Sequence, residues 1–455
     1  MAWLCNPDAA TAASPAEKNL PPEPRFNPVD YGAKRDGVTY DTAAIQKAID
    51  ACSGTGGSVV LKPGNYVSAE LTLRGGMTFH LEKGAVLLGG TNAADYPVLI
   101  PPTTPSKANT RSLLYACKAD NLVIEGPGEI NGRGSMVQMW GKEPERPSLI
   151  RIFQSANVTV RDVTLRNPRM WTQVYSECSG LLIDHVTVDA PPNCANLDGM
   201  DLCDSRDVTV RNCLVKSEDD SICLKTHGAR GLANITVENN RLTSFRANAI
   251  KLGTATVGPV SGLVFRHNII DSAKYGGICI ESVDGAVVSD VRVEGLEMSN
   301  VSQPLFIRLA RRNGNNGASD LEPGTRPLGS IDGVLIEGLH AVSNQVQTRP
   351  SCSITGIPGG RVRNVTLRNC SFTMPGGMTN VPDLPPEREG DYPQSDIVKN
   401  PPAYGLFIRH ADDIRLENVS FSFFKPDVRP WIFSEDASVS TNGCRSLGLL
   451  PQAGH

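Results

Sequence analysis

A short phrase recurs along the chain at nearly constant intervals, and it constrains the fold more than any other feature. It has the form x-V-x-V-x-N-x-x-V and begins at Asn157, Gly180, Asp207, Asn234, Gly262, Asp290, Gly333, Asn364 and Asp413. Successive starts are 23, 27, 27, 28, 28, 43, 31 and 49 residues apart. Within each phrase, apolar and polar residues alternate over four positions before a polar residue, which is the period of a strand and not of a helix.

Short strands that recur with such a period cannot bury an apolar face alone, so they must stack on their neighbours. A β-sandwich or propeller would need Asn-Gly or Asp-Gly hairpins at regular two-residue loops, and these do not punctuate the strands. We therefore predict an all-β fold, a right-handed parallel β-helix of about ten coils.

The rest of the chain can be placed around these coils. Residues 41–52 have the spacing of an amphipathic helix, with Asp41 or Thr42 as N-cap, that covers the first open edge. The 43- and 49-residue intervals predict long loops, such as RRNGNNGASDLEPGTRP and GGMTNVPDLPPEREGDYPQSDIVKNPPAYG. We expect a leader at 1–27, a single catalytic domain at 28–440 and a tail at 441–455.

Composition limits the partners. Charged residues make up 20% of the chain and the net charge is −4, so no basic stripe is present to bind nucleic acid. No apolar run of about 18 residues occurs, so we expect no membrane-spanning helix. The first residues lack an intact signal peptide, and a secreted or periplasmic location is expected, with a cytoplasmic one as the alternative. Among the twelve cysteines no CxxC spacing occurs, and Cys213, Cys223, Cys279 and Cys370 are predicted to be buried.

Acidic residues form a second ladder. DGMDL begins at Asp198, DSICL at Asp220, NAIKL at Asn248 and GGICI at Gly276. Equivalent residues of neighbouring coils lie about 4.8 Å apart, so Asp198 and Asp220 are expected to stack with Asp219 beside them. The alternation directs Met200, Leu202, Ile222 and Leu224 inward and the acids toward an outer groove.

Three carboxylates in such a position repel one another, which raises at least one pKa and leaves a protonated acid beside ionised bases. Glycosidic cleavage needs that combination, because one group protonates the leaving oxygen and another activates water. The plainer interpretation is that Asp198 and Asp220 only form Asx turns, as in many solenoids. We expect catalysis without a metal or another cofactor, on a carbohydrate substrate.

At these residues the chain resembles glycoside hydrolase family 28, the polygalacturonases and rhamnogalacturonan hydrolases. The phrases VDYGAKRDGVTYDTAAIQKAIDAC, GPGEINGRG, NLDGMD and SEDDSICLK carry the resemblance, which runs from Val29 to Thr226, with weaker phrases to about residue 424. It implies the β-helix fold and hydrolysis with inversion. It also implies that Asp219 is the general acid and that Asp198 and Asp220 activate the water.

The chain also departs from that family. Polygalacturonases carry Gly-His-Gly and Arg-Ile-Lys in the next two coils, whereas here Asn248 stands in the His position and Gly277 and Cys279 lie at or near the cation positions. The resemblance then implies a divergent member with a rhamnogalacturonan-like or other pectic substrate.

Further residues are candidates for substrate binding. They are Asn196, Lys225, Asn248, Lys251, Glu281, Arg308 and His410, with Trp171, His227, Asp284, Arg311 and Arg312 as weaker candidates. Arginine and lysine can bind a sugar carboxylate, although charge clusters often only face solvent.

Two other function classes stay open on the sequence. A pectate-lyase-type polysaccharide lyase would use the acids to bind calcium, and a non-catalytic carbohydrate-binding β-helix would leave them exposed and far apart. The long C-terminal loops are rich in proline, so we expect them to cover one end of the groove and to favour exo-acting cleavage.

Overall fold

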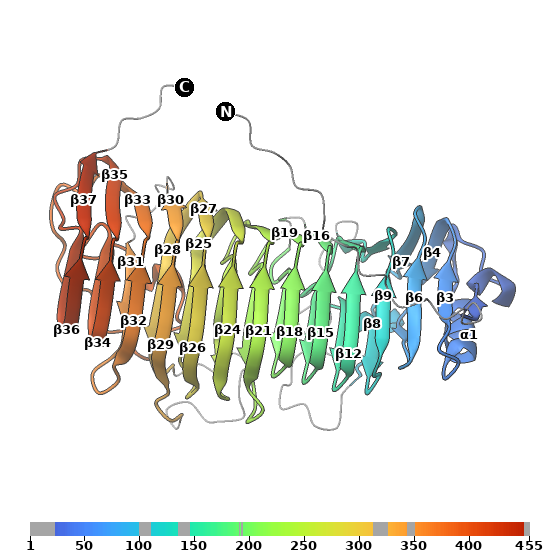
Figure 1. Ribbon diagram of the computed structural model, residues 1–455. Helices are drawn as coiled ribbons and strands as arrows, with labels where there is room; N and C mark the ends of the chain where they lie inside the picture. The colour runs from blue at the N-terminus through green and yellow to red at the C-terminus, as the bar shows by residue number, and fades with distance from the viewer. Residues whose placement is uncertain are drawn as a thin grey trace, which may run out of the picture.

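The computed structural model describes residues 23–99, 111–134, 146–190, 192, 194–312, 326–343 and 351–449. These residues form an elongated parallel β-helix that runs from the blue N-terminal end to the red C-terminal end in Figure 1. Strand pairing is parallel from rung to rung, and it joins the strands into three ladders that share one hydrogen-bonded sheet. The predicted fold class is confirmed.

The alternating part of each recurring phrase lies on one of these ladders, which we call ladder A, whereas the last apolar residue of the phrase lies in the following strand, as Leu165 does in β13 (Thr164–Arg166). The strands of ladder A are β1 (Arg25–Phe26), β3 (Ser58–Leu61), β6 (Met77–Leu81), β9 (Leu122–Glu125), β12 (Ala156–Arg161), β15 (Ser179–Asp184), β18 (Arg206–Arg211), β21 (Leu232–Glu238), β24 (Val260–Arg266), β26 (Val287–Glu294), β29 (Ser330–Glu337), β32 (Val362–Arg368), β34 (Leu406–Glu417) and β36 (Ile432–Asn442). The phrases account for β12 to β34, so ladder A continues past the recognisable repeat at both ends.

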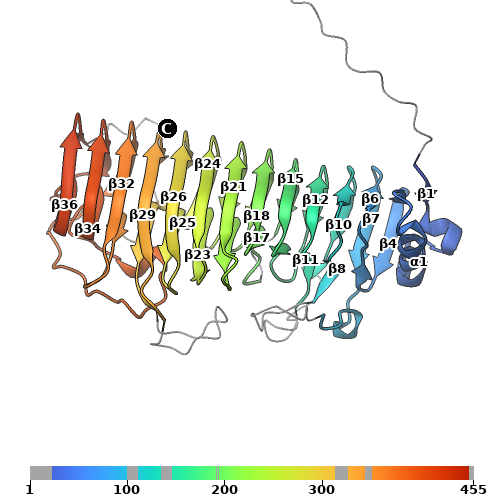
Figure 2. The same cartoon turned by 60° about the horizontal axis from the view of Figure 1, so that its bottom comes forward.

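Ladder B carries the acids. It contains β5 (Leu71–Thr72), β8 (Ser112–Cys117), β11 (Ser148–Phe153), β14 (Gln173–Ser176), β17 (Met200–Cys203), β20 (Ile222–Thr226), β23 (Ile250–Thr256), β25 (Ile269–Ser282), β28 (Val301–Leu309), β31 (Cys352–Thr355), and the first parts of β34 and β36. In Figure 2, β8, β11, β17 and β23 run beside the strands of ladder A.

Ladder C closes each coil. It contains β2 (Asp36–Tyr40), β4 (Gly64–Ser68), β7 (Ala85–Gly89), β10 (Glu129–Asn131), β13 (Thr164–Arg166), β16 (Thr187–Asp189), β19 (Leu214–Ser217), β22 (Arg241–Ser244), the first part of β25, β27 (Glu297–Ser299), β30 (His340–Val342), β33 (Ser371–Gly376), β35 (Ser420–Lys425) and β37 (Arg445–Leu449).

The core fills the interior of the coils. One contiguous cluster of buried side chains extends from Ala33 to Phe421. Met200, Leu202, Ile222 and Leu224 are all fully buried in it, as the alternation predicts. The cysteines predicted to be buried are so, and the described cysteines are free.

Left-handed backbone explains why the recurring phrase begins and bends at Asn, Asp, Gly or His. Asn157 has a φ of 56° and Asp162, five residues later, has 59°; Asn234 and Asn239 repeat the pair at 55° and 56°. Residues with a large or branched side chain resist this conformation, whereas Gly, Asn and Asp adopt it most readily. The phrase is therefore a strand between two left-handed corners.

The predicted helix is α1 (Thr42–Cys52), which lies at the N-terminal end of the sheet in Figure 1. Its apolar residues Ile45, Ala48 and Ile49 are buried. Asp41 occupies the N-cap position but does not cap the helix, because its carboxylate accepts hydrogen bonds from the backbone N–H groups of Lys34 and Arg35 at 2.6 and 2.9 Å.

The sheet extends past both of the domain boundaries expected from the sequence. β1 pairs with β3 ahead of residue 28, and β37 pairs with β35 beyond residue 440. The remainder of the expected leader, and the loop between Arg312 and Arg326, lie largely outside the described residues.

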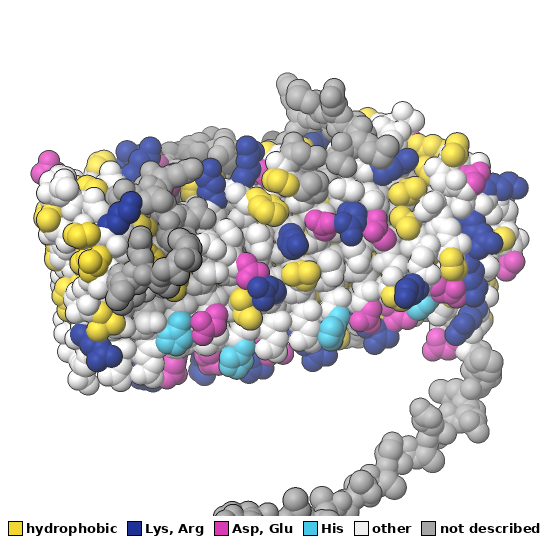
Figure 3. All heavy atoms as spheres, turned by 90° about the horizontal axis from the view of Figure 1, so that it is seen from above, with side chains coloured by type: hydrophobic (Ala, Val, Ile, Leu, Met, Phe, Trp, Pro, Cys, Tyr) yellow, Lys and Arg dark blue, Asp and Glu magenta, His cyan; other side chains and the backbone are white. Residues whose placement is uncertain are grey.

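On the face shown in Figure 3, cations and anions are interspersed. Rung-to-rung pairs of opposite charge, such as Arg161 with Glu125 and Arg266 with Glu238, also occur along ladder A. Within the described part of the chain, no helix has the length and apolar character needed to cross a membrane.

Candidate active site

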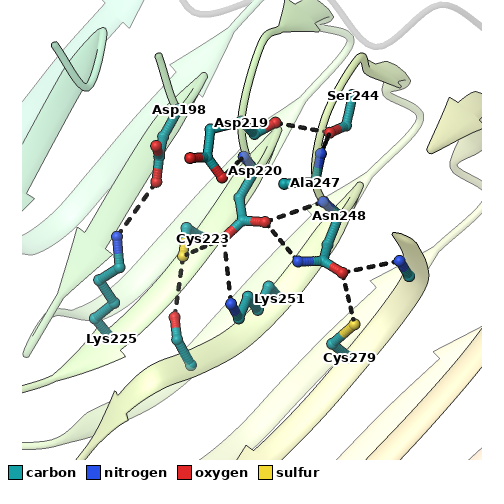
Figure 4. A network of polar contacts seen from close by, with 12 residues as sticks. Asp198, Asp219, Asp220, Cys223, Lys225, Ser244, Ala247, Asn248, Lys251 and Cys279 are labelled. Atoms are coloured by element: carbon teal, nitrogen blue, oxygen red, sulfur yellow. Dashed lines mark hydrogen bonds and ion pairs between the residues drawn. The ribbon is translucent and has the colours of Figure 1, made fainter. Parts of the chain in front are cut away.

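The strand register of ladder B brings the acids together. Met200 pairs with Ile222, Ile222 with Ile250, and Ile250 with Ile278. The residues two positions earlier, Asp198, Asp220, Asn248 and Gly276, therefore occupy equivalent places on successive rungs, as predicted. Figure 4 shows Asp198, Asp219 and Asp220 side by side at the tips of neighbouring turns.

Asp198 belongs to a buried group of charges with Asp201 and Lys225. The Lys225 ammonium lies 3.4 Å from Asp198 Oδ2 and also pairs with Asp201 Oδ1. Asp198 Oδ1 and Asp201 Oδ2 are buried, and neither accepts a hydrogen bond from any residue that the structure describes. Burial and the Asp201 charge raise the pKa of Asp198 well above its usual range, although Lys225 opposes them.

Asp201 was missed in the sequence. It stands between Met200 and Leu202, which both point inward, so the strand alternation directs it to the same outer face as the acids. Burial raises the pKa of Asp201 as well, against the neighbouring Lys225.

Asp219 and Asp220 lie in the tight turn between β19 and β20. The Asp219 Oδ1 atom accepts a hydrogen bond from the backbone N–H of Asp220 at 2.9 Å. The hydroxyls of Ser217 and Ser244 each donate to the Asp219 carbonyl oxygen at 2.8 Å. These bonds fix the turn, so that both carboxylates project at the same edge of ladder B.

Asp220 is held by the next rung. Its Oδ1 accepts hydrogen bonds from the Asn248 backbone N–H at 3.0 Å and from Asn248 Nδ2 at 2.7 Å. Its Oδ2 lies 3.6 Å from the Lys251 ammonium. Carboxylate oxygens of Asp198 and Asp220 lie within 4.8 Å of one another, close enough to share one water molecule.

Asp219 is the half-buried member of the group, whereas Asp198 and Asp220 are buried. Burial, followed by the Asp220 charge, raises the pKa of Asp219 to about 7, against the opposing charge of Lys251. A carboxyl group that keeps its proton near neutral pH, beside a carboxylate held by a lysine and an amide, is the arrangement that acid–base cleavage needs.

The cluster of Asp198, Asp220 and Cys223 has the spacing of metal ligands. Its donor set does not suit calcium, because Lys225 and Lys251 already pair with the two carboxylates. Burial raises the pKa of the Cys223 thiol well above its usual range, so it stays protonated, and a thiol is a poor ligand for a metal ion.

Comparison with known proteins agrees with the fold. The model of glycosyl hydrolases family 28 matches residues 52–377. The chain belongs to glycosyl hydrolases family 28. An endo-polygalacturonase of Pectobacterium carotovorum subsp. carotovorum is 25% identical over 360 residues, covering 72% of this chain and 87% of that relative. An exo-poly-alpha-D-galacturonosidase of Dickeya chrysanthemi is 23% identical over 482 residues, covering 92% and 74%.

Among solved structures, a family 28 exopolygalacturonase of Yersinia enterocolitica matches with a TM-score of 0.71 and 20% identity, covering 96% of this chain and 80% of that one. At that identity the match supports the fold. The protein is a family 28 glycosidase.

Asn248, Gly277 and Cys279 stand at or near the positions where the family resemblance predicts cationic side chains, and the structure shows how each is packed. Asn248 Oδ1 accepts hydrogen bonds from the Gly276 backbone N–H at 2.8 Å and from the Cys279 thiol at 3.3 Å, so its amide bridges two rungs. A Cβ atom at Gly277 would lie 2.5 Å from Met298 Sδ, which leaves no room for a longer side chain. The packing around Asn248 and Gly277 is therefore adapted to the residues that this chain has in place of the family's cations.

Glu281 and Lys251 are the nearest charged candidates on the C-terminal side of the acids. Lys251 is buried, and its ammonium donates to the Tyr392 hydroxyl at 3.4 Å. Glu281 is also buried, and its Oε2 has no hydrogen-bond partner. Burial raises the pKa of Glu281 to about 8, against the charge of Lys251.

The remaining candidates each have a hydrogen-bond partner other than the acids. Arg308 donates to the Glu387 carbonyl at 2.6 Å. His410 on β34 lies between Glu387 and Asp436, at 2.9 and 2.6 Å. Asn196 accepts a hydrogen bond from Arg146 at 2.9 Å.

Of the weaker candidates, Trp171 lies beside the charged group of the site, and the others have different surroundings. Trp171 occupies the rung before Asp198, and Lys225 Nζ lies 3.9 Å from its ring centroid. Asp284 and Arg312 form a buried ion pair with each other at 2.7 Å, away from solvent. The backbone N–H of His227 donates to Asp204 at 2.9 Å, and Arg311 is exposed.

Sequence reasoning also missed Tyr392, whose contact with Lys251 joins residues that are 141 positions apart. The connection between β33 and β34, residues 377–405, forms what we call the cover segment. Its Pro385 and Glu387 carbonyls accept hydrogen bonds from Arg409 and Arg308, at 2.8 and 2.6 Å, and Ser395–Ile397 lie against β25 and β28. The cover segment therefore lies along ladder B on the C-terminal side of the acids.

Proposed function

We propose that this protein is an inverting, exo-acting glycoside hydrolase of a pectin-type polysaccharide, with a galacturonide- or rhamnogalacturonan-like chain as substrate. The observation that carries the proposal is the acid cluster on two neighbouring rungs. Asp219 is half-buried with a pKa of about 7, and the carboxylates of Asp198 and Asp220 lie within 4.8 Å of each other.

In this mechanism Asp219 gives its proton to the glycosidic oxygen as the bond from that oxygen to the anomeric carbon breaks. Asp198 and Asp220 hold one water molecule and take a proton from it while its oxygen forms the new bond to the anomeric carbon. Attack from the side opposite the leaving group inverts the anomeric configuration. Lys225 and Lys251 balance the charge of the two carboxylates while the proton moves.

The cover segment supports exo action. A solenoid groove is open at both ends by default, and a segment that lies along it on one side of the acids leaves room for only a short piece of the polymer there. Tyr392, which contacts Lys251, brings the segment to the rung next to Asp220. The relatives include both endo- and exo-acting enzymes, so we infer exo action from the position of the cover segment and not from the relatives.

The lyase alternative is less well supported. It needs a cation between the acids, where Lys225 and Lys251 already supply positive charge. The non-catalytic alternative required exposed, distant acids, and the acids are close together and largely buried. We also infer that the protein acts outside the cytoplasm, since a polymeric substrate does not cross a membrane.

Product analysis tests the proposal. The enzyme and its Asp219→Asn variant are incubated with pectic substrates, and reducing ends, viscosity and ultraviolet absorbance are followed together. We expect mono- or disaccharide as the early product, no unsaturated product, activity that survives chelator, and a loss of roughly 10²-fold or more in kcat for the variant. Unchanged turnover in the variant, or a chelator-sensitive unsaturated product, would refute it.

A further inference from the structure

The outer face of ladder B continues past the acids toward the N-terminus, onto β14, β11 and β8. Register places Arg151 beside Tyr115 on one side and Val174 on the other, and Val174 beside Asp201. Because Asp201 points to the outer face, Arg151 occupies the same outward column, two rungs before it. This part of the face contributes nothing to the mechanism described above.

Arg151 is buried yet almost without partners. It is 3% exposed, and in the described part of the molecule its one hydrogen bond runs from Nε to Ser148 Oγ at 3.2 Å. Its Nη2 atom is buried with no acceptor. Buried polar groups are nearly always paired, so an unpaired guanidinium nitrogen calls for an explanation.

Other buried arginines of this protein show what Arg151 lacks. Arg312 makes two hydrogen bonds to the Asp284 carboxylate, at 2.7 and 2.8 Å. Arg429 likewise makes two bonds to Asp427, at 3.0 and 2.9 Å. A planar guanidinium matches a carboxylate in this bidentate way, and Arg151 has no such partner. Burial lowers the pKa of Arg151 to about 10, although the charge of Asp201 opposes this shift.

Aromatic rings flank this guanidinium. Its Cζ lies 5.8 Å from the Trp171 ring centroid, and the half-exposed Tyr115 on the preceding rung lies 6.1 Å from Phe153, centroid to centroid. Rings with an apolar face beside a few fixed polar groups are the usual lining of a small-molecule site. On the next rungs toward the C-terminus, Lys225 and Lys251 already pair with carboxylates, so they are less available to an anionic group than Arg151 is.

We propose that Arg151 binds the carboxylate of a uronic-acid unit held over β8, β11 and β14, on the N-terminal side of the acids. This inference rests on the proposed function and specifies its substrate. The anionic sugar lies on the side of Arg151, and the unit on the side of Asn248 and Glu281, where Lys251 is already paired with Asp220, is recognised through its hydroxyl groups. The carboxylate supplies the partner that Nη2 lacks.

Binding tests this assignment without requiring turnover. In an Asp219→Asn background, calorimetry measures the affinity for a short galacturonate-containing pectic oligosaccharide and for the same compound after carboxyl reduction. We expect Arg151→Gln to weaken binding of the acidic compound by about 10- to 100-fold and to leave binding of the reduced compound within about twofold. Arg151→Lys restores part of the loss. Arg266→Gln, on the far surface of ladder A, serves as the matched control.

The outcomes separate the two proposals. An equal loss with both compounds, or no loss with either, would overturn the role of Arg151 even if the parent protein hydrolyses pectin. If the parent hydrolyses nothing, yet Arg151→Gln selectively weakens binding of the acidic compound, the proposed function fails and the carboxylate site stands.

Discussion

Among the residues of the site, Asp219 differs from its neighbour Asp220 in environment and not in chemistry. It is half-buried and raised in pKa to about 7, whereas Asp220 is held by Asn248 and Lys251. The same side chain can therefore serve as acid in one position and as base in the next.

This difference predicts the pH profile. The proposed donor carries its proton below about pH 7 and loses it above, so kcat/KM should fall about tenfold per pH unit on the alkaline side. A pH–rate series on one oligosaccharide measures this limb, and in Asp219→Asn the limb should be absent. A parent rate that still rises between pH 7.5 and 9 would contradict the assignment.

Glu281 makes a separate prediction about stability. Its pKa is about 8 when folded and 4.5 in its ordinary state, so between these values the unfolded chain loses the proton first. The free energy of unfolding therefore falls as pH rises from about 4.5 to 8 and then levels. Glu281→Gln removes this loss, and its melting temperature should exceed that of the parent by at least about 2 °C at pH 8.5 but not at pH 4.5. Equal differences at both pH values would show that Glu281 ionises normally.

At the scale of the element, the left-handed corners of ladder A decide which residues the repeat accepts. Asn239 follows β21 with a φ of 56° and an exposed side chain. A valine there should cost about 1–2 kcal/mol in urea unfolding, and a glycine close to nothing, because only valine resists this backbone conformation. Thr236→Val, in the extended part of β21, is the control. A valine tolerated equally at both sites would refute the explanation.

The cover segment is the element that separates exo from endo action in this proposal. Replacing residues 380–394 with a short Gly-Ser linker removes Tyr392 and the carbonyls that bind Arg308 and Arg409, but leaves the acids in place. We expect polymer viscosity to fall earlier per bond cleaved, and longer products to appear first. An unchanged product pattern in a folded variant would mean that the segment does not limit substrate entry.

At the scale of the whole molecule, stability is not uniform along the solenoid. β36 and β37 contain no buried residue, and each pairs with a neighbour on one side alone. β18 to β24 lie in the middle of the stack and contribute fully buried side chains to the core. Amide hydrogen exchange should therefore be faster in β36–β37 than in β18–β24, by at least about tenfold. Uniform protection along the chain would indicate that the last rung is stabilised by something else.

The sequence by itself determined the solenoid and the acid stack. Each recurring phrase is a local strand between two left-handed residues, so its residue types can be recognised without tertiary information. Once the rungs are aligned, the stacking of Asp198, Asp220 and Asn248 follows from the constant spacing of parallel strands.

Only the tertiary structure decided which charged side chains form ion pairs and which stay unpaired. Asp201 and Arg151 lie in the same outward-facing column of ladder B. Asp201 pairs with Lys225, whereas Arg151 Nη2 has no hydrogen-bond partner among the described residues. The sequence pattern does not show this difference, because the partner of each residue is set by side chains on other rungs. Arg308 and His410, which are predicted to bind the substrate, also have hydrogen-bond partners in the cover segment, and no repeat specifies the path of that connection. Periodicity places side chains on faces, whereas burial and long-range contacts determine their charge and their use.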